Sequence, residues 1–326
     1  MRLACSRYAL ITALLLCIGQ ALGATVEPRR QIPDPSLTTR QRTAPDTAQG
    51  CPLRQPHWID VLLLQVWLDR HNFSCGSIDG VFGAKSIAAW QAWQKASSNE
   101  PFPMEELAAD WLLTSHTVTQ EDYAALVDIP AAWEARAKLP TMGFESIAEL
   151  VAEDYHLSPK ALARLNPNAT FPNPPVGTVL IVPDTKNVAL EPAARLEIDL
   201  NRFALSAYDA TGRQIAHFPV SIARNRSKRP EGALSIETIV PDPNYLYDPA
   251  NYGNPPGERK QVIPPGPNNP VGVVWFGLNL PGYGLHGSPH PETIGRAESK
   301  GCFRLNNWNA LKLLQMIRPH TPLSVH

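Results

Sequence analysis

Proline is the residue that most constrains how this chain can fold, because 33 of its 326 residues are proline. Each proline fixes its own φ angle and lacks a backbone donor, so it interrupts helices and is excluded from central strands. Such a composition favours loops, turns and linkers over one continuous helical body. Since the length suits two or three small domains, the sequence predicts a multidomain α+β chain built from short elements.

The first 23 residues have the layout of a secretory signal peptide. Arginines precede a short apolar run, and Ala21 and Gly23 provide the small residues of a cleavage site. The run is too short to span a bilayer, which takes about 20 residues, and no later apolar segment is long enough to do so. We therefore expect cleavage after Gly23, export to the periplasm or cell envelope, and no membrane span. Lipidation of Cys17 is disfavoured because the bulky Leu16 precedes it.

Cysteine counting singles out one thiol. Removal of the signal peptide leaves Cys51, Cys75 and Cys302, an odd number in an oxidising compartment. Cys51 and Cys75 lie on either side of one helix-like segment and form the natural disulfide pair, which would stabilise the fold by about 3 kcal/mol. The alternative, a zinc site with His57 and His71, matches none of the usual ligand spacings. Cys302 then has no cysteine partner.

Hydrophobic periodicity divides the N-terminal half into segments. Residues 24–50 are polar and aperiodic, which predicts a disordered spacer. In residues 51–100, the helical patterns "HWIDVLLLQVWLDR" and "AKSIAAWQAWQ" flank a "DG" turn and predict a small helical domain. Residues 101–140 predict a helical connector that prolines interrupt.

Residues 141–184 show a different order of elements. Ser146 can cap a helix with Glu149 three residues on, and Ser158 followed by Pro159 starts a second short helix. The final "GTVLIVP" predicts a strand. Together these signals predict a strand–helix–helix–strand (βααβ) domain whose first strand has the weakest sequence signal.

Residues 194–326 predict a mostly-β domain of short alternating strands, with "DATG" as a hairpin turn. Residues 241–270 are crowded with Pro, Asn, Gly and Tyr, which is typical of a lid or a binding loop. After Cys302, "NWNALKLLQMI" predicts an amphipathic helix with Asn306 or Asn307 as its cap. The residues best suited to chemistry lie in this domain.

Cys302 lies in surroundings that favour a nucleophilic thiolate. The pKa of a free thiol, about 8.5, falls beside cations and helix N-termini, and Lys300, Arg304 and the predicted helix flank this one. His286 ends the preceding predicted strand and is the candidate general base, while Gly301 lets consecutive amides face a developing oxyanion. The sequence therefore predicts a nucleophile–base pair. The alternative is a small buried cysteine with a histidine in the core.

Other classes of ligand are disfavoured. A formal net charge of -1 gives no general attraction to nucleic acid or to an anionic membrane. "GYGLHG" fits GxGxxG, but the prolines of the following "SPHP" disfavour the helix that a dinucleotide site needs. His286 and His290 would converge on a metal only from a helix, and the glutamate of HExxH is missing. We expect no cofactor and no metal.

The stretch "HGSPHPETIGRAESKGCFRLNNWNAL" resembles the signature of the YkuD-type L,D-transpeptidases, which read HG(T/S), a short loop and (S/T)HGC(I/V)RL. The resemblance implies that Cys302 is the nucleophile and that His286 is the general base, oriented by a backbone carbonyl. It also implies that the amides of Gly301 and Cys302 donate to the oxyanion. Ser299 and Arg304 match positions that shape the site, and Arg304 could bind a substrate carboxylate or form a salt bridge.

The resemblance covers about residues 194–326 and implies a cell-wall enzyme with a mostly-β catalytic domain. Cys302 would form a thioester with a tetrapeptide stem, and an amine of a second stem or of an anchored lipoprotein would resolve it into a peptidoglycan cross-link. Water as the acceptor would instead give carboxypeptidase or endopeptidase activity. Lys300 stands where the family usually has histidine and keeps a positive charge near the thiol. A catalytically silent wall-binding protein is the alternative that this change leaves.

Two N-terminal resemblances imply binding to the same polymer. Residues 52–96, with "DGVFG" between two helices and a final "WQ", resemble the helical peptidoglycan-binding module. Residues 141–184, with "LNP" and "VGTVLIVP", resemble LysM, which binds glycans that contain N-acetylglucosamine. Tethering through both modules would raise the effective concentration of an insoluble substrate.

Overall fold

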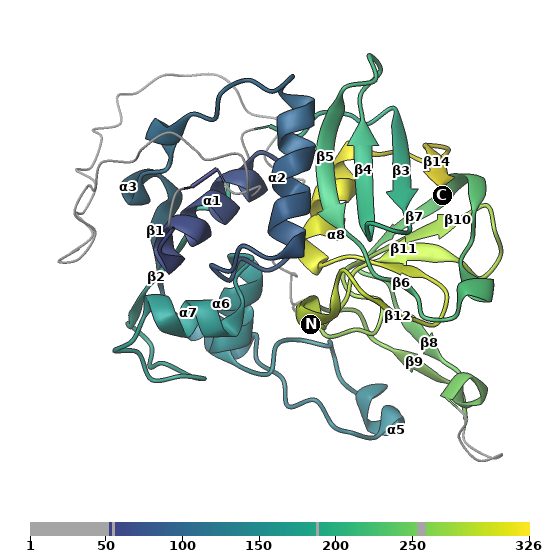
Figure 1. Ribbon diagram of the computed structural model, residues 1–326. Helices are drawn as coiled ribbons and strands as arrows, with labels where there is room; N and C mark the ends of the chain where they lie inside the picture. Colours follow the sequence, from purple (N-terminus) through teal and green to yellow (C-terminus); the bar gives the residue numbers. More distant parts are fainter. Residues whose placement is uncertain (1–51, 54–55, 187–188, 253–258) are drawn as a thin grey trace, which may run out of the picture. The chain divides into compact units, whose positions relative to one another are not determined.

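The computed structural model describes residues 52–53, 56–186, 189–252 and 259–326 (Figure 1). The predicted signal peptide, the predicted spacer and Cys51 of the predicted disulfide lie outside these residues. All described residues fall within one unit of the fold. Among them, no helix combines the length and the apolar character that crossing a membrane requires.

Two helices, α1 (Trp58–Arg70) and α2 (Ala84–Ala96), begin the described chain, as the periodicity predicts. Gln65 of α1 is 1% exposed and fixes the turn between them. Its Oε1 accepts the backbone N–H groups of Asp79 at 3.0 Å and Gly80 at 2.7 Å. Gly80 has a φ of 73°, where a side chain would be strained, so the "DG" turn needs its glycine.

A two-stranded sheet and two helices form the next part of the fold. β1 (Leu113–Thr117) pairs antiparallel with β2 (Val179–Pro183), and α6 (Ile147–Asp154) and α7 (Pro159–Leu165) lie between them in the sequence. Both predicted serine caps are present, since each Oγ accepts a backbone N–H at 3.2 Å. The βααβ order predicted for residues 141–184 is therefore only partly present, because its first strand lies outside that range and two further short helices stand between β1 and α6. We call β1, α6, α7, β2 and the turns that join α6, α7 and β2 the βααβ part.

That first strand lies inside the predicted helical connector, residues 101–140, so the connector prediction is wrong for residues 113–117. The strand forms because β2 supplies a backbone partner along its whole length, which outweighs local preference. The remainder of the segment does contain the expected short helices. They are η3 (Met104–Glu106), α3 (Ala109–Leu112), α4 (Gln120–Ala124) and α5 (Trp133–Arg136).

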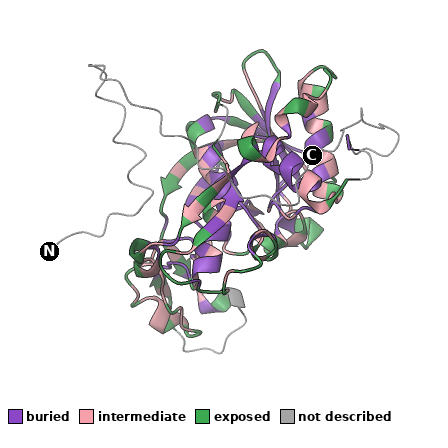
Figure 2. Ribbon diagram, turned by 90° about the vertical axis from the view of Figure 1, so that its left-hand side faces the viewer, coloured by how far each residue is buried: buried purple, intermediate pink, exposed green. Residues whose placement is uncertain are grey.

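An eight-stranded sheet forms the core of the C-terminal part, in the order β13-β11-β10-β7-β14-β3-β4-β5 (Figure 1). The last strand of the chain, β14, lies inside this sheet, parallel to β3 and antiparallel to β7. Buried residues concentrate in these strands and on the inward faces of the helices (Figure 2). The mostly-β prediction for this part is confirmed. The elements are β3 (Arg195–Asp199), β4 (Ala204–Tyr208), β5 (Gln214–Pro219), β6 (Ile222–Ala223), η4 (Arg226–Lys228), β7 (Gly232–Pro241), η5 (Pro249–Tyr252), β10 (Val274–Leu278), β11 (Gly284–His286), η6 (Pro291–Thr293), β12 (Ala297–Ser299), β13 (Phe303–Arg304), α8 (Asn307–Met316) and β14 (Pro322–Val325).

The segment predicted as a lid holds a short hairpin, in which β8 (Tyr245–Tyr247) pairs with β9 (Gln261–Ile263). Its buried face packs on Met142, in the segment that precedes α6. The ring of Trp133 from α5 stacks on that of Tyr247, with the ring centres 4.4 Å apart. Residues between β1 and α6 therefore cover one side of the hairpin.

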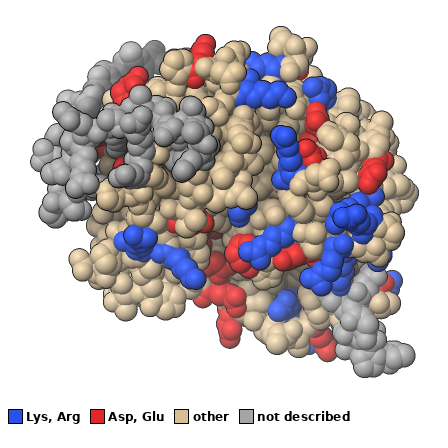
Figure 3. Space-filling model, viewed as in Figure 1, with Lys and Arg blue, Asp and Glu red and all other residues tan. Residues whose placement is uncertain are grey.

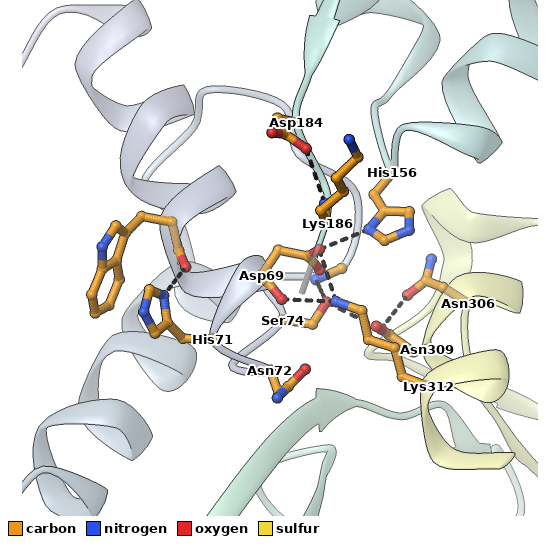
Figure 4. A network of polar contacts seen from close by, with 12 residues as sticks. Asp69, His71, Asn72, Ser74, His156, Asp184, Lys186, Asn306, Asn309 and Lys312 are labelled. Atoms are coloured by element: carbon orange, nitrogen blue, oxygen red, sulfur yellow. Dashed lines mark hydrogen bonds and ion pairs between the residues drawn. The ribbon is translucent and has the colours of Figure 1, made fainter. Parts of the chain in front are cut away.

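A buried polar network joins α1 to the βααβ part and to α8 (Figure 4). Oδ2 of Asp69 lies 2.7 Å from Nδ1 of His156 and 2.8 Å from Nζ of Lys312, and all three side chains are almost fully buried. Burial alone would raise the pKa of Asp69, but Lys312 and His156 together lower it well below its usual range. The helical part, the βααβ part and the sheet part thus share charged contacts in their interior.

Candidate active site

Cys302 lies one residue before β13, which pairs in parallel with β11. The register places Arg304 of β13 opposite His286 of β11. Residues opposite each other in a ladder share a face of the sheet, so the imidazole and the guanidinium lie on one face, while Cys302 precedes the strand in a loop. The structure therefore places the predicted base on β11 and the predicted nucleophile at the start of the neighbouring strand β13.

The loop that carries Cys302 is held at both ends by β6 and the residues that flank it. At one end the carbonyl of Ser299 accepts the N–H of Arg224 at 3.0 Å. At the other end Ser221 and Arg304 exchange backbone hydrogen bonds of 2.9 and 3.0 Å. Within the loop, the Ser299 hydroxyl donates to the carbonyl of Cys302 at 2.6 Å. These bonds restrict the backbone on both sides of the thiol.

His286 is 6% exposed, and its ring stacks on that of Trp275 with the ring centres 5.7 Å apart. Its Nδ1 lies 2.6 Å from the carbonyl oxygen of Gly287. Since a carbonyl only accepts, Nδ1 carries the proton of the neutral ring and Nε2 keeps a free lone pair. The pKa of His286 is lowered to about 4, mainly by burial and partly by the charge of Arg304. At neutral pH the ring is therefore an uncharged proton acceptor.

The Cys302 thiol is partly buried, and burial raises its pKa more than a backbone hydrogen bond with Gly284 lowers it. Its Sγ also lies 3.9 Å from the carbonyl oxygen of Gly282. The lowered pKa expected from the sequence is therefore wrong, because the flanking cations do not outweigh the desolvation of the sulfur. A protonated thiol makes proton transfer to a base part of any reaction at this site.

The other predicted site residues are arranged around the thiol in different ways. Gly301 faces Tyr283, and a Cβ at this glycine would lie 3.4 Å from the tyrosine ring. The side chain of Lys300 is exposed. Within the described part of the chain, Nε and Nη2 of Arg304 are buried and have no hydrogen-bond partner. The Arg304 guanidinium therefore keeps donors that the described chain does not use, and the binding of a substrate carboxylate stays a prediction.

The second thiol of the described chain lies apart from this loop, in the helical part. Cys75 is 2% exposed, and burial raises its pKa to about 12, which makes it a poor nucleophile. Its predicted disulfide partner, Cys51, lies outside the described residues, so that disulfide stays a prediction. Cys302 is the more accessible thiol of the two.

Asn307 and Glu153 form a contact next to the backbone that orients His286, a role that the sequence did not reveal. Asn306 occupies the N-cap position of α8 but makes no side-chain cap bond, and Asn307 is the first residue of the helix. Nδ2 of Asn307 donates instead to Oε1 of Glu153 at 2.9 Å. Oδ1 of Asn307 packs so closely against Gly287 that a Cβ at this glycine would force the asparagine side chain to move. Asn307 therefore contacts the residue whose carbonyl orients His286, and only the folded chain shows this.

A Glu153→Gln variant is expected to change how stability depends on pH. Burial raises the pKa of Glu153 to about 8, so the folded chain keeps a proton that the unfolded chain releases above about pH 4. Wild-type stability therefore falls as the pH rises between these values. Glutamine keeps an acceptor for Asn307 and carries no charge, so the variant should gain about 1–3 kcal/mol at pH 8.

Urea unfolding at about pH 5 and about pH 8 measures this effect. Glu145→Gln is the matched control, because Glu145 lies just before α6 and is exposed. We expect no pH-dependent gain in that control. A Glu153→Gln variant that is less stable than the wild type at both pH values would contradict the assignment of a protonated Glu153.

Comparison with known proteins places this site in a family. Residues 193–325 match the sequence model of the YkuD family, described as the L,D-transpeptidase catalytic domain. The putative L,D-transpeptidase YkuD of Bacillus licheniformis is 25% identical over 177 residues, covering 54% of this chain and 92% of that protein. The putative L,D-transpeptidase YkuD of Bacillus subtilis is 35% identical over 60 residues, covering 18% and 37%.

Solved structures of L,D-transpeptidases are also similar to this chain. The L,D-transpeptidase from Mycobacterium smegmatis is 16% identical, covers 47% of this chain and 75% of its own, and has a TM-score of 0.32. We base the family assignment on the sequence model and on the curated relatives. Residues 193–325 of this chain therefore belong to the YkuD family of L,D-transpeptidase catalytic domains.

Proposed function

We propose that this chain is a peptidoglycan-modifying L,D-transpeptidase of the cell envelope, with Cys302 as nucleophile and His286 as general base. The observation that carries the proposal is the hydrogen bond from Nδ1 of His286 to the Gly287 carbonyl. It leaves Nε2 as a proton acceptor on β11, the strand that pairs with the one that Cys302 directly precedes. The raised pKa of Cys302 supports the same assignment, because a protonated thiol needs a base.

In the first step, Sγ of Cys302 attacks the carbonyl of the L-centre of diaminopimelate in a tetrapeptide stem, and the thiol proton passes to Nε2 of His286. The N–H groups of Gly301 and Cys302 stabilise the oxyanion. Collapse to the thioester breaks the bond to D-Ala, whose amine leaves with the proton from His286. The side-chain amine of a second stem then attacks the thioester carbonyl and gives a proton to His286, the C–S bond breaks, and the sulfur leaves as the thiol with the proton from His286. Ser299 holds the nucleophile backbone, and Arg304 receives a substrate carboxylate.

The N-terminal parts would tether the enzyme to its polymer. Residues 51–100 supply the helix–turn–helix core of a peptidoglycan-binding module, and residues 141–184 supply three of the four elements of a LysM-like unit. The alignment with the Bacillus licheniformis protein is longer than the catalytic domain and reaches back into residues 141–184. With the predicted signal peptide, these parts would bring the enzyme to peptidoglycan outside the cytoplasm. An anchored lipoprotein is a further candidate acceptor.

Mass spectrometry of the mature chain with tetrapeptide-bearing muropeptides tests the proposal. We expect an acyl adduct on Cys302 and a cross-linked dimer, and neither product with Cys302→Ser. Tripeptide stems without dimers would assign water as the acceptor, and hence a carboxypeptidase. Absence of both adduct and product with the wild type would overturn the enzymatic function.

The alternative of a catalytically silent chain is based on Lys300, which stands where the family usually has histidine. A Lys300→His variant restores the residue usual in the family, and it belongs in the same experiment. We expect the wild type to form the adduct already, because the hydrogen bond that orients the proposed base His286 does not depend on that histidine. An adduct that appears only in the variant would favour the silent wall-binding protein.

A further inference from the structure

A group of exposed cations lies beside the loop that carries Cys302. Arg224 directly follows β6, and Arg226 and Lys228 begin and end η4. All three side chains are exposed. We call these three residues the cationic rim.

The cationic rim is tied to the active-site loop through the backbone. The N–H of Arg224 donates to the carbonyl of Ser299 at 3.0 Å, and the Ser299 hydroxyl reaches the carbonyl of Cys302 three residues further on. β6 itself pairs in parallel with β12, the strand that leads into this loop. The rim therefore starts at the point where the loop is anchored, and its position relative to Cys302 is set by main-chain hydrogen bonds.

The three rim charges are not compensated inside the described part of the chain. None of their charged ends has an ion pair or a hydrogen bond there, whereas neighbouring Arg229 donates its Nε to the carbonyl of Ala223. Glu298 is the acidic residue nearest to Cys302 in the loop sequence. Its Oε1 lies 3.8 Å from Nη1 of Arg296, so it pairs with that arginine and not with the rim. Lys and Arg side chains gather on the right-hand side of Figure 3, where Figure 1 places β6 and β12. This local excess contrasts with the net charge of -1 for the whole chain.

We propose that Arg224, Arg226 and Lys228 select donor stem peptides that carry free carboxylates over stems whose carboxyl groups are amidated. The inference rests on the proposed function, because it concerns the substrate of the same site. A stem peptide carries carboxylates on both sides of the bond that Cys302 would attack. Exposed charges within a screening length of about 10 Å attract such a substrate without direct contact, and they act on binding rather than on the chemical step.

Acylation kinetics of Cys302 with two synthetic tetrapeptides test the cationic rim. One peptide has a free α-carboxylate on its D-glutamate, and the other carries the amide there. For the wild type at low salt we expect a roughly five- to twentyfold preference for the free acid, expressed in KM and not in kcat. In 1 M salt, where the screening length is about 3 Å, the preference should disappear.

The triple variant Arg224→Gln, Arg226→Gln and Lys228→Gln should lose this preference and keep the wild-type rate with the amidated peptide. Arg318→Gln is the control, because Arg318 is exposed in the turn between α8 and β14. It should leave the preference unchanged. The proposed role of the cationic rim is overturned if the triple variant retains the preference, or if the wild type reacts equally with both peptides.

Two other outcomes separate the possible causes. A wild type that reacts with neither peptide overturns the proposed function, and with it the carboxylate selection proposed for the cationic rim. Binding to phosphatidylglycerol vesicles that the triple variant loses, without any peptide preference in the wild type, would assign the rim to a membrane surface instead. A preference that is lost in the triple variant, with no vesicle binding, supports the rim as a carboxylate selector.

Discussion

A His286→Gln variant is expected to form the Cys302 acyl-enzyme about 10²–10⁴-fold more slowly than the wild type. The reason lies in the two pKa shifts. Burial raises the pKa of the Cys302 thiol, so little thiolate is present before the substrate arrives. His286 is neutral above about pH 4 and holds its lone pair on Nε2, so it can take the proton during attack. Glutamine can be held in the same place, but it accepts no proton at neutral pH.

The pH profile separates the loss of a base from a structural effect. The wild-type rate should fall as the pH drops through about 4, where His286 becomes protonated and can no longer accept. The variant has no such base and depends on thiolate that forms without help, so its rate should rise with pH in the alkaline range. Rates of adduct formation, followed by mass spectrometry between about pH 3 and 10, show both limbs.

His290→Gln is the matched control for this experiment. His290 lies in the same loop, but its side chain is exposed and its ring nitrogen is 3.8 Å from Glu292. We expect the control to keep the wild-type rate and pH profile. A His286→Gln variant within about threefold of the wild type at neutral pH would contradict the assignment of His286 as the general base.

Residues that act through their immediate neighbours could be predicted from the sequence. Ser146 and Ser158 cap helices because each hydroxyl needs only a backbone N–H three residues away. Cys302 and His286 stood out because glycines and cations surround the one thiol left without a partner cysteine. The parallel pairing of β11 and β13 then places His286 on one strand and Cys302 directly before its neighbour.

Properties that depend on distant segments could not be predicted in this way. β1 has little strand signal of its own and forms because β2 pairs with it. The pKa of Cys302 follows burial, which is a tertiary property, and the local charges alone pointed in the wrong direction. Asp69 and Lys312 are 243 positions apart, so nothing near either residue indicates the contact.

That contact leads to the largest stability effect that we expect. Lys312→Met should lower the free energy of unfolding by about 3–5 kcal/mol, a large share of the roughly 5–15 kcal/mol that a typical fold has. Nζ of Lys312 donates to both the carbonyl oxygen and Oδ2 of Asp69, and both side chains are almost fully buried. Without the ammonium group, the Asp69 carboxylate stays in the interior with only His156 as its partner, and the pKa of that histidine is itself lowered by burial.

The pH dependence of stability gives the sign of this effect. The pKa of Asp69 in the folded chain is lowered below its unfolded value of about 3.9. Its contribution is therefore present above about pH 4 and is lost as the pH falls below that value. We expect the full difference between wild type and Lys312→Met at pH 7 and a smaller difference near pH 3, measured by urea unfolding.

The double variant Asp69→Leu and Lys312→Met provides the control, because it removes both charges and leaves neither buried alone. It should recover most of the stability that Lys312→Met loses, since apolar replacement of a buried pair is often neutral. Because Asp69 belongs to α1, His156 to the βααβ part and Lys312 to α8, the loss should appear in one transition shared by all three parts. A Lys312→Met variant that changes stability by less than about 1 kcal/mol at pH 7, or that unfolds its N-terminal helices separately, would contradict the coupling through this network.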